Sequence, residues 1–448
     1  MKSLKLSIGA GLNEGILKDI FRSLHYRNFR LFFIGQSISL IGTWIQRIAL
    51  PWLVYDLTKS AFLLGLIGFA GQIPMFFIAP FAGVLTDRLN RYQLLIATQV
   101  FAMLQAFILA FLVLSGQINV GLILILNILL GCINAFDTPV RQSFFIEIID
   151  KKEDLPNAIA LNSSMVNAAR LLGPSIAGVL IAFTGEGICF LINAVSYIPV
   201  VTSLLMMRIP KKLQPRNSSH VFNELKEGFT YTFGHKTLKY IILLLALVSL
   251  MGMPYTVLMP VFAKEILHGG SHTFGFLMGA SGLGALCGAL YLASKKNVLG
   301  LGKLIAYSAA LFGLSLLIFS FSRRFEFSIF LMIFIGLGMM LQMASSNTLL
   351  QTLSDDDKRG RVMSFYTMAY MGTAPFGSLL AGGLADIIGV AFTIGFGGIC
   401  CIIGAVIFWQ KLPVLRQLLH PLYVKMGIIP EVSSGIQSAS DLHIPPEE

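Results

Sequence analysis

The chain has 448 residues, of which 55% are hydrophobic and 12% charged, with a formal net charge of +11 and a mean hydropathy of +0.77. A water-soluble globule cannot bury so much apolar surface, so an ordinary soluble domain is excluded. The basic residues lie in short segments between apolar runs rather than on one soluble face, which argues against nucleic-acid binding. The five cysteines fall inside apolar runs without paired spacing, so we expect neither disulfides nor a metal site.

Apolar segments long enough to cross a membrane recur along the whole chain. A bilayer core of about 30 Å requires about 20 apolar helical residues. Twelve spans are predicted, at residues 29–55, 60–85, 93–114, 119–141, 156–183, 188–207, 238–262, 273–293, 302–321, 327–350, 361–384 and 388–409. The sequence therefore predicts an all-α membrane protein with twelve transmembrane helices in two six-helix lobes. The expected parts are an N-terminal segment 1–28, an N-terminal lobe 29–207, a linker 208–237, a C-terminal lobe 238–409 and a tail 410–448.

The distribution of basic residues predicts the orientation of these spans. With the N-terminus inside the cell, 27 of the 33 Lys and Arg residues lie on the cytoplasmic side. The predicted outer loops carry four, namely Lys59, Lys264, Arg323 and Arg324. Because cytoplasmic loops of membrane proteins are enriched in Lys and Arg, we expect both termini to be cytoplasmic.

The first span contains a charged residue far from either end. Arg47 lies in the stretch Leu40–Asp56, close to Gln36, Trp44 and Gln46. An Arg inside the bilayer costs at least about 3 kcal/mol unless it faces protein, water or an anion. Arg47 therefore either binds an anionic or oxygen-rich substrate in a central cavity, with Trp44 holding its apolar part, or extends to the outer interface and braces helices.

The loop after the second span reads Gly83-Val-Leu-Thr-Asp87-Arg88-Leu-Asn90-Arg91. It resembles the signature loop of the major facilitator superfamily, with Asn90 in place of the usual second Gly. The resemblance implies that Gly83 permits close helix approach, that Asp87 pairs with helix ends or an Arg, and that Arg88 and Arg91 hold a cytoplasmic gate. A basic loop obeying the orientation rule would account for the two arginines, but not for Gly83 and Asp87.

The fourth span carries Asn134, Asp137 and Arg141 near its cytoplasmic end. Asp137 and Arg141 are four residues apart, so they can pair on one helix face. Such a pair could seal the inner gate. Asp137 is also the acidic residue placed farthest inside a span, which makes it the first candidate for a carboxylate that carries a coupling proton.

The fifth span contains Asn162, Arg170 and the segment Gly173-Pro174-Ser-Ile-Ala-Gly178. The segment is similar to the glycine–proline motif in the fifth helix of antiporters of the same superfamily. Gly173 and Pro174 weaken the backbone hydrogen bonds and let another helix approach, which would help the helix bend. A packing kink without a role in export is the alternative. Arg170 is expected to face the cavity or a carboxylate.

These motifs together are similar to one branch of the superfamily, which includes the bacterial enterobactin exporter. The resemblance extends over residues 21–410 and rests on the first-span motif, on Asn134–Ser143 and on Asn157–Ser164. It implies an alternating-access carrier that binds its substrate between two lobes and exchanges it for protons. A siderophore or another amphiphilic metabolite or drug is the implied cargo.

The second half adds an amphipathic linker and one polar candidate. Phe222, Leu225, Phe229 and Phe233 share a helical face, as expected of a helix lying in the cytoplasmic interface. Gln342 joins Gln36, Gln46, Asn134 and Asn162 as an amide that either lines the cavity or bonds a neighbouring helix. The sequence contains no nucleophile–base arrangement and no phosphate-binding loop, so we predict neither an enzyme nor a cofactor.

The sequence thus predicts a secondary transporter that exports a small amphiphilic molecule across a bacterial inner membrane. Its expected partners are the small-molecule substrate, protons and the lipid bilayer, and the expected state is a monomer. A flippase of lysophospholipids or an importer is one alternative. A membrane sensor or assembly factor that transports nothing is the other, and it would show no substrate flux and no dependence on Arg47.

Overall fold

The computed structural model describes residues 21–86, 89–149, 151–209, 221–295, 299–355 and 358–425. All regular structure in these ranges is helical. The N-terminal group consists of η1 (Arg22–His25), α2 (Arg27–Thr58), α3 (Ala61–Thr86), α4 (Arg91–Leu114), α5 (Val120–Glu147), η2 (Lys152–Asp154), α6 (Leu155–Thr184) and α7 (Glu186–Leu205). After α8 (Val221–Gly234), the C-terminal group consists of α9 (Lys236–Leu247), η3 (Val248–Gly252), α10 (Tyr255–Val261), η4 (Phe262–Ile266), α11 (Ser271–Ser294), α12 (Leu301–Ser320), α13 (Phe325–Leu353), α14 (Arg359–Thr367), η5 (Met368–Gly372), α15 (Ala374–Ile388) and α16 (Val390–Lys425).

Each predicted span corresponds to one helix or to one nearly continuous series of helices. Within the described ranges, eleven of these are long and apolar enough to cross a membrane by length and composition. The exception is α2, which occupies the position of the first span but is less apolar because it carries Arg30, Gln36, Gln46 and Arg47. The predicted all-helical membrane fold with about twelve spans is therefore confirmed.

Polar residues set where several helices begin. The Asn90 side chain accepts hydrogen bonds from the backbone N–H groups of Tyr92 and Gln93 at the start of α4. Asn119 caps α5 in the same way, through the N–H of Leu122. These side chains satisfy donors that the first helical turn leaves free. The short polar segments between apolar runs therefore act as helix boundaries.

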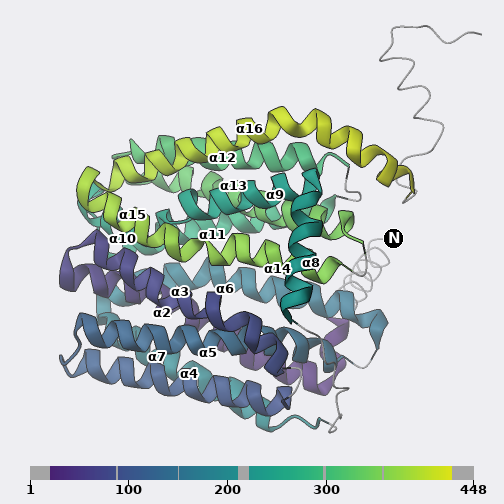
Figure 1. The fold of residues 1–448 in the computed structure, drawn as a ribbon. Helices are drawn as coiled ribbons and strands as arrows, with labels where there is room; N and C mark the ends of the chain where they lie inside the picture. Colours follow the sequence, from purple (N-terminus) through teal and green to yellow (C-terminus); the bar gives the residue numbers. More distant parts are fainter. Residues whose placement is uncertain are drawn as a thin grey trace, which may run out of the picture.

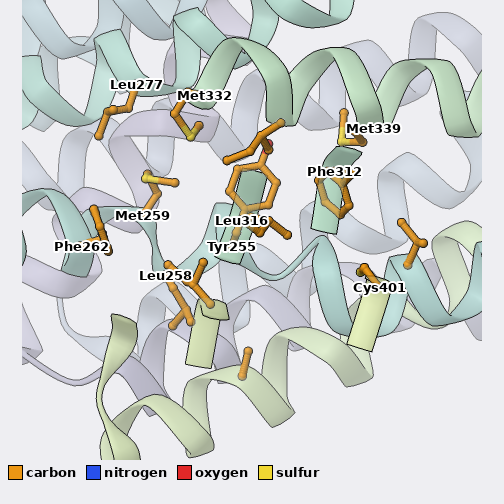
Figure 2. Close-up of a cluster of buried hydrophobic side chains, with 14 of the residues drawn as sticks. Tyr255, Leu258, Met259, Phe262, Leu277, Phe312, Leu316, Met332, Met339 and Cys401 are labelled. Atoms are coloured by element: carbon orange, nitrogen blue, oxygen red, sulfur yellow. The ribbon is translucent and has the colours of Figure 1, made fainter. Parts of the chain in front are cut away.

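The helices of each group lie side by side (Figure 1), with purple to blue helices in one part of the view and teal to yellow helices in the other. Buried aromatic residues fill both interiors. In the N-terminal group, Phe32 packs against Phe144 and Phe145. In the C-terminal group, the ring of Tyr255 lies 6.2 Å from that of Phe312 (Figure 2). Burying such side chains in close-packed form stabilises the two interiors.

Two series in the C-terminal group depart from regular α-helical structure. Between α9 and α10 the helix widens into the π-turn η3, and between α14 and α15 into the π-turn η5. The hydroxyl of Ser249 in η3 donates to the carbonyl of Tyr370 in η5. π-Turns interrupt the hydrogen-bond ladder of a helix and frequently lie at functional sites. Tyr370 therefore sits on a locally widened segment that a neighbouring side chain stabilises.

Glycine residues bring the two groups into close contact. A Cβ atom built on Gly178 of α6 would lie 2.8 Å from the Cα of Gly275 in α11. Gly65 of α3 approaches Gly382 of α15 similarly, at 2.9 Å. The hydroxyl of Ser271 donates to the carbonyl of Gly178 at 3.1 Å. Small residues of this kind let membrane helices approach at backbone distance, so each pair of helices forms a tight seam.

The linker helix α8 packs against the C-terminal group at the end where α14 begins (Figure 1). Phe229 and Phe233 contact the ring of Phe365 of α14. Glu227 forms an ion pair with Arg361, another α14 residue. The apolar face predicted for this helix is thus partly covered by α14, although Phe229 remains 54% exposed. The side chains of Phe222 and Leu225 lie outside the described part.

Replacing Gly178 by Val is expected to separate α6 from α11. Overpacking a tight contact costs about 1–3 kcal/mol, which shifts the equilibrium between packed and separated helices by about fivefold to somewhat over a hundredfold. The measurement is the rate at which a water-soluble maleimide labels a cysteine at Leu64, which is 2% exposed, in protein without other cysteines. Gly383→Val is the control, because the nearest atom to a Cβ there is at 4.0 Å. Equal labelling rates in both variants would contradict the prediction.

Candidate functional site

Arg47 lies well inside α2, and its side chain is nevertheless exposed. Its guanidinium carbon is 5.0 Å from the centre of the Trp44 ring, in a cation–π contact. Arg47 lies within electrostatic range of Arg170 of α6 and of Tyr370 of η5. An exposed side chain with neighbours on both groups faces the space between them. The sequence alone had left the alternative of an Arg extending to the outer interface.

Arg170 lies in the same region and reaches the C-terminal group. Its Nη2 is 3.8 Å from the sulfur of Met339 in α13. Tyr255 of α10 and Tyr370 of η5 both lie within electrostatic range of Arg170. The hydroxyl of Tyr255 forms a hydrogen bond with the hydroxyl of Ser281 of α11 at 3.0 Å. The inter-group site thus combines two arginines from the N-terminal group with aromatic hydroxyls and a thioether from the C-terminal group.

Neither arginine has a carboxylate partner in the part of the chain that the structure describes. Among the described residues, no Asp or Glu oxygen lies within 4.0 Å of the guanidinium nitrogens of Arg47 or Arg170. Arg141 adds a third positive charge in electrostatic range of Arg47, but it has an acidic partner. Two like charges close together in a membrane interior repel one another and need a counter-charge. The arrangement is therefore suited to an anion.

Asp137 is buried in the N-terminal group, where three side chains bond its carboxylate. Thr98 donates at 2.9 Å and Gln99 at 2.6 Å to the same oxygen. Arg141 approaches the other oxygen at 3.3 Å, as the spacing of four residues predicts. Arg141 also donates to Gln36 at 3.4 Å. Asp137 is thus paired with Arg141. In this conformation it is not the carboxylate partner that we considered for Arg170.

The five predicted amides lie in different environments. Gln46 is buried and accepts a hydrogen bond from Asn193 of α7 at 2.7 Å, within the N-terminal group. Gln36 and Gln342 are buried as well, and each has an Nε2 atom without a described partner. Asn134 and Asn162 are half-buried. Of the predicted cavity residues, Arg170 makes a described side-chain contact with the other group, through Met339, whereas no described hydrogen bond of the five amides joins the two groups.

The residues predicted for the cytoplasmic gate are only partly described. Asp87 and Arg88 lie outside the described residues, and so do the surroundings of Gly83. Arg91, at the start of α4, forms an ion pair with Glu147 at the end of α5 at 2.5 Å. This pair links two helices of the same group.

The predicted helix-bending motif lies beside the arginine site. A Cβ on Gly173 would lie 2.4 Å from the Cβ of Trp44, so this glycine admits the Trp44 side chain. The carbonyl of Pro174 approaches Gly275 across the seam with α11. Gly173, Pro174 and Gly178 thus bring α6 close both to α2 and to the C-terminal group.

A set of polar contacts joins the two groups at one end of the bundle, here named the closed end and defined by Tyr55–Ala61, Lys264, Glu265 and Asp386. Lys264 pairs with Asp56 at 2.5 Å, and Lys59 pairs with the same carboxylate at 2.7 Å. The hydroxyl of Tyr55 donates to Glu265. Asp386 accepts from the N–H of Ala61 at 3.0 Å and from Ser60. We call these contacts of Asp56, Glu265 and Asp386 the latch. The sequence analysis did not predict it, although acidic residues at the ends of predicted spans could have indicated it.

Residues 20–421 match the family described as transmembrane secretion effector. The chain belongs to this family, within the major facilitator superfamily. It is 29% identical to the staphyloferrin A transporter of Staphylococcus aureus over 85% of this chain and 95% of that protein. It is 24% identical to macrolide efflux protein A of Streptococcus pyogenes over 82% of this chain and 92% of that protein.

Solved structures agree on the fold. The chain is similar to a bacterial homologue of the iron transporter ferroportin in an inward-facing state, with a TM-score of 0.67 and 17% identity over 86% of this chain and 98% of that one. The transmembrane secretion effector described here is therefore a multi-pass membrane transporter of small molecules with the major facilitator fold, and not an enzyme. Its predicted resemblance to this branch of the superfamily is confirmed.

Replacing Asp56 by Asn is expected to weaken the latch. Asp56 follows the apolar part of α2, and hydrogen bonds from Lys264 and then Lys59 lower the pKa of its carboxyl. The ionised form therefore stabilises the closed end above the ordinary Asp pKa of about 4, and this contribution is lost as the pH falls through the lowered value. Spin labels at Leu57 and His272, both exposed, report the separation.

In the unsubstituted protein, the separated population should grow only below about pH 4. In Asp56→Asn it should be larger already at pH 7 and should lose that pH dependence. Identical distance distributions for the two proteins at pH 7 would show that the latch does not hold the closed end.

Proposed function

We propose that this transporter exports a small amphiphilic anion, with a siderophore as its leading candidate, by alternating access coupled to proton antiport. The observation that carries the proposal is the pair Arg47 and Arg170, which lie between the two groups with no described carboxylate partner. In a medium of low dielectric constant, an anionic substrate would supply the missing counter-charge. The same two charges would repel a cationic drug.

The surroundings of the arginines favour a substrate with both polar and apolar parts. Trp44 stacks with Arg47 and offers an aromatic face, and Met339 offers a polarisable thioether beside Arg170. The hydroxyls of Tyr255 and Tyr370 would accept or donate hydrogen bonds. Siderophores combine acidic iron-binding groups with a larger organic framework. The relative named staphyloferrin A transporter supports this class, whereas the relative named macrolide efflux protein A supports drug-like cargo.

We further propose that the closed end faces the outside of the cell and that both termini are cytoplasmic. The charge distribution supports this orientation, because the predicted outer loops carry only four basic residues. Apart from the contact of Arg170 with Met339, the inter-group hydrogen bonds and ion pairs among described residues lie toward that end, at Asp56, Glu265, Ser271 and Asp386. The conformation is then inward-facing, ready to receive a substrate from the cytoplasm. Gly83, Asp87, Arg88, Arg91 and Arg141 would form the gate on the cytoplasmic side, and the carrier would act as a monomer.

Asp137 remains our candidate for proton coupling. Its carboxylate is buried, accepts hydrogen bonds from Thr98 and Gln99, and forms an ion pair with Arg141. A proton on Asp137 would release Arg141, whose charge already reaches Arg47. Arg141 would then join Arg47 and Arg170 in attracting the next anion. Proton binding and substrate binding would in this way be linked through one side chain.

Replacing Arg47 by Ala is expected to reduce export at least about tenfold, because hydrogen bonds between charged partners contribute roughly 1.5–3 kcal/mol each. The measurement is the amount of iron chelator inside and outside iron-starved cells. The chromosomal gene is deleted in these cells, and a plasmid supplies either the original gene or a variant. Chelator should accumulate inside with Arg47→Ala and with Arg170→Ala. Arg47→Lys should restore part of the export because the charge is kept.

Lys411→Gln is the matched control, since this exposed basic residue lies in α16 after the predicted twelfth span, away from the closed end. Each variant must be present in the membrane at the level of the original protein. Normal secretion by cells without the gene, in a strain with no second exporter, would overturn the siderophore proposal. A panel of drugs and lysophospholipids would then separate the remaining transport functions.

Replacing Asp137 by Asn is expected to uncouple transport from protons. In proteoliposomes, exchange of labelled substrate without a pH gradient should persist. A pH gradient, in contrast, should no longer increase the amount of substrate that accumulates. Thr98→Val is the control, because it removes one hydrogen bond to the same carboxylate but leaves the titratable group. Gradient-driven accumulation that survives Asp137→Asn would assign coupling to another residue.

A further inference from the structure

The short connection between α12 and α13 carries two adjacent arginines, Arg323 and Arg324, at the closed end. Both side chains are exposed. Among the basic side chains described at this end, Lys59 and Lys264 share Asp56, whereas no described carboxylate lies within 4.0 Å of either arginine. Two cations here also run against the general depletion of Arg and Lys on the side that we propose to be external.

Local hydrogen bonds fix the backbone of this connection. Ser322 is 3% exposed. Its hydroxyl forms a hydrogen bond with the hydroxyl of Ser328 at 2.8 Å and donates to the carbonyl of Arg324 at 3.3 Å. Arg323 donates from Nη1 to the carbonyls of Ser320 and Ser322, each at 3.2 Å. The two guanidinium groups therefore start from a preorganised turn rather than from a loose loop, and Arg324 makes no described hydrogen bond with its side chain.

The arginines border a hollow of about 440 Å³ whose other walls are largely apolar. It is lined by Ile318, Phe321, Ser322, Arg323, Arg324 and Phe327. Phe321 is 69% exposed and Phe327 is 46% exposed. Exposed apolar side chains continue from the hollow along both helices, at Leu314 of α12 and Phe330 of α13. In a membrane protein such a continuous apolar surface faces lipid chains.

We propose that this hollow binds one anionic phospholipid, with the phosphate between Arg323 and Arg324 and an acyl chain along Phe321 and Phe327. The two arginines stand where α12 ends and α13 begins, which is the depth of the lipid headgroups. A guanidinium matches a phosphate with paired, charge-assisted hydrogen bonds. Aromatic rings are favoured at the same depth, so the charge, the apolar walls and the position all fit one lipid molecule.

The test is native mass spectrometry of the full-length protein, purified in detergent and titrated with phosphatidylglycerol or phosphatidylcholine. We expect one phosphatidylglycerol to bind more tightly than the rest, and Arg323→Gln combined with Arg324→Gln to weaken that binding by about tenfold or more, because each basic group near an anionic lipid surface contributes on the order of a fivefold gain. Phosphatidylcholine should show no such tight step.

Lys236→Gln combined with Lys239→Gln is the control, because it removes two exposed charges at the opposite end of the C-terminal group. Its tight phosphatidylglycerol step should be unchanged. Loss of the step in both double variants would assign binding to overall charge and overturn the site. Equal affinity for the two lipids would overturn it as well, as would binding of inorganic phosphate that displaces the lipid. Thermal unfolding of each variant checks that the fold is intact.

Discussion

The low dielectric constant of the bilayer is the constraint on which the rest of this structure depends. It requires every backbone group in the membrane to be bonded within a helix, and it makes each uncompensated charge expensive. Asp137 and Arg141 meet this requirement by pairing with each other and with neighbouring polar side chains. Arg47 and Arg170 have no acidic partner within the described chain, which is why we propose that an anionic substrate supplies their counter-charge.

The contacts between the two groups are of two physical kinds. The seams of α6 with α11 and of α3 with α15 consist mainly of small residues in van der Waals contact, with one described side-chain hydrogen bond, from Ser271 to Gly178. The latch around Asp56 and Glu265 consists of directional bonds between charged or polar groups. A seam of glycines can slide or separate with the loss of few hydrogen bonds, whereas the latch holds one arrangement until its ion pairs and hydrogen bonds are broken. The combination suits a carrier with two discrete states.

Much of the fold could be predicted from the sequence, because apolar segments of bilayer length have few alternatives to a transmembrane helix. The pairing of Asp137 with Arg141 also followed from their spacing. The π-turns at Val248–Gly252 and Met368–Gly372 could not be predicted, since they depend on tertiary contacts such as the one between Ser249 and Tyr370. For the same reason sequence patterns failed to indicate Tyr55 and Glu265 as partners, which lie 210 residues apart. They do predict Arg47 as a candidate, because the cost of an Arg in a membrane is intrinsic to the residue.

The charges inside the bundle are distributed unequally between the two groups. In the described C-terminal helices, charged residues lie at the ends of the membrane-crossing segments, whereas Arg47, Asp137, Arg141 and Arg170 all belong to the N-terminal group. With Asp137 and Arg141 neutralising each other, the proposed site would carry two positive charges before substrate binds, and an occupant with two negative charges would cancel them. The membrane potential, which acts with about 2.3 kcal/mol per charge per 100 mV, would then act on the return of the empty carrier rather than on the loaded step. The voltage dependence of the transport cycle would thus originate in one half of the molecule.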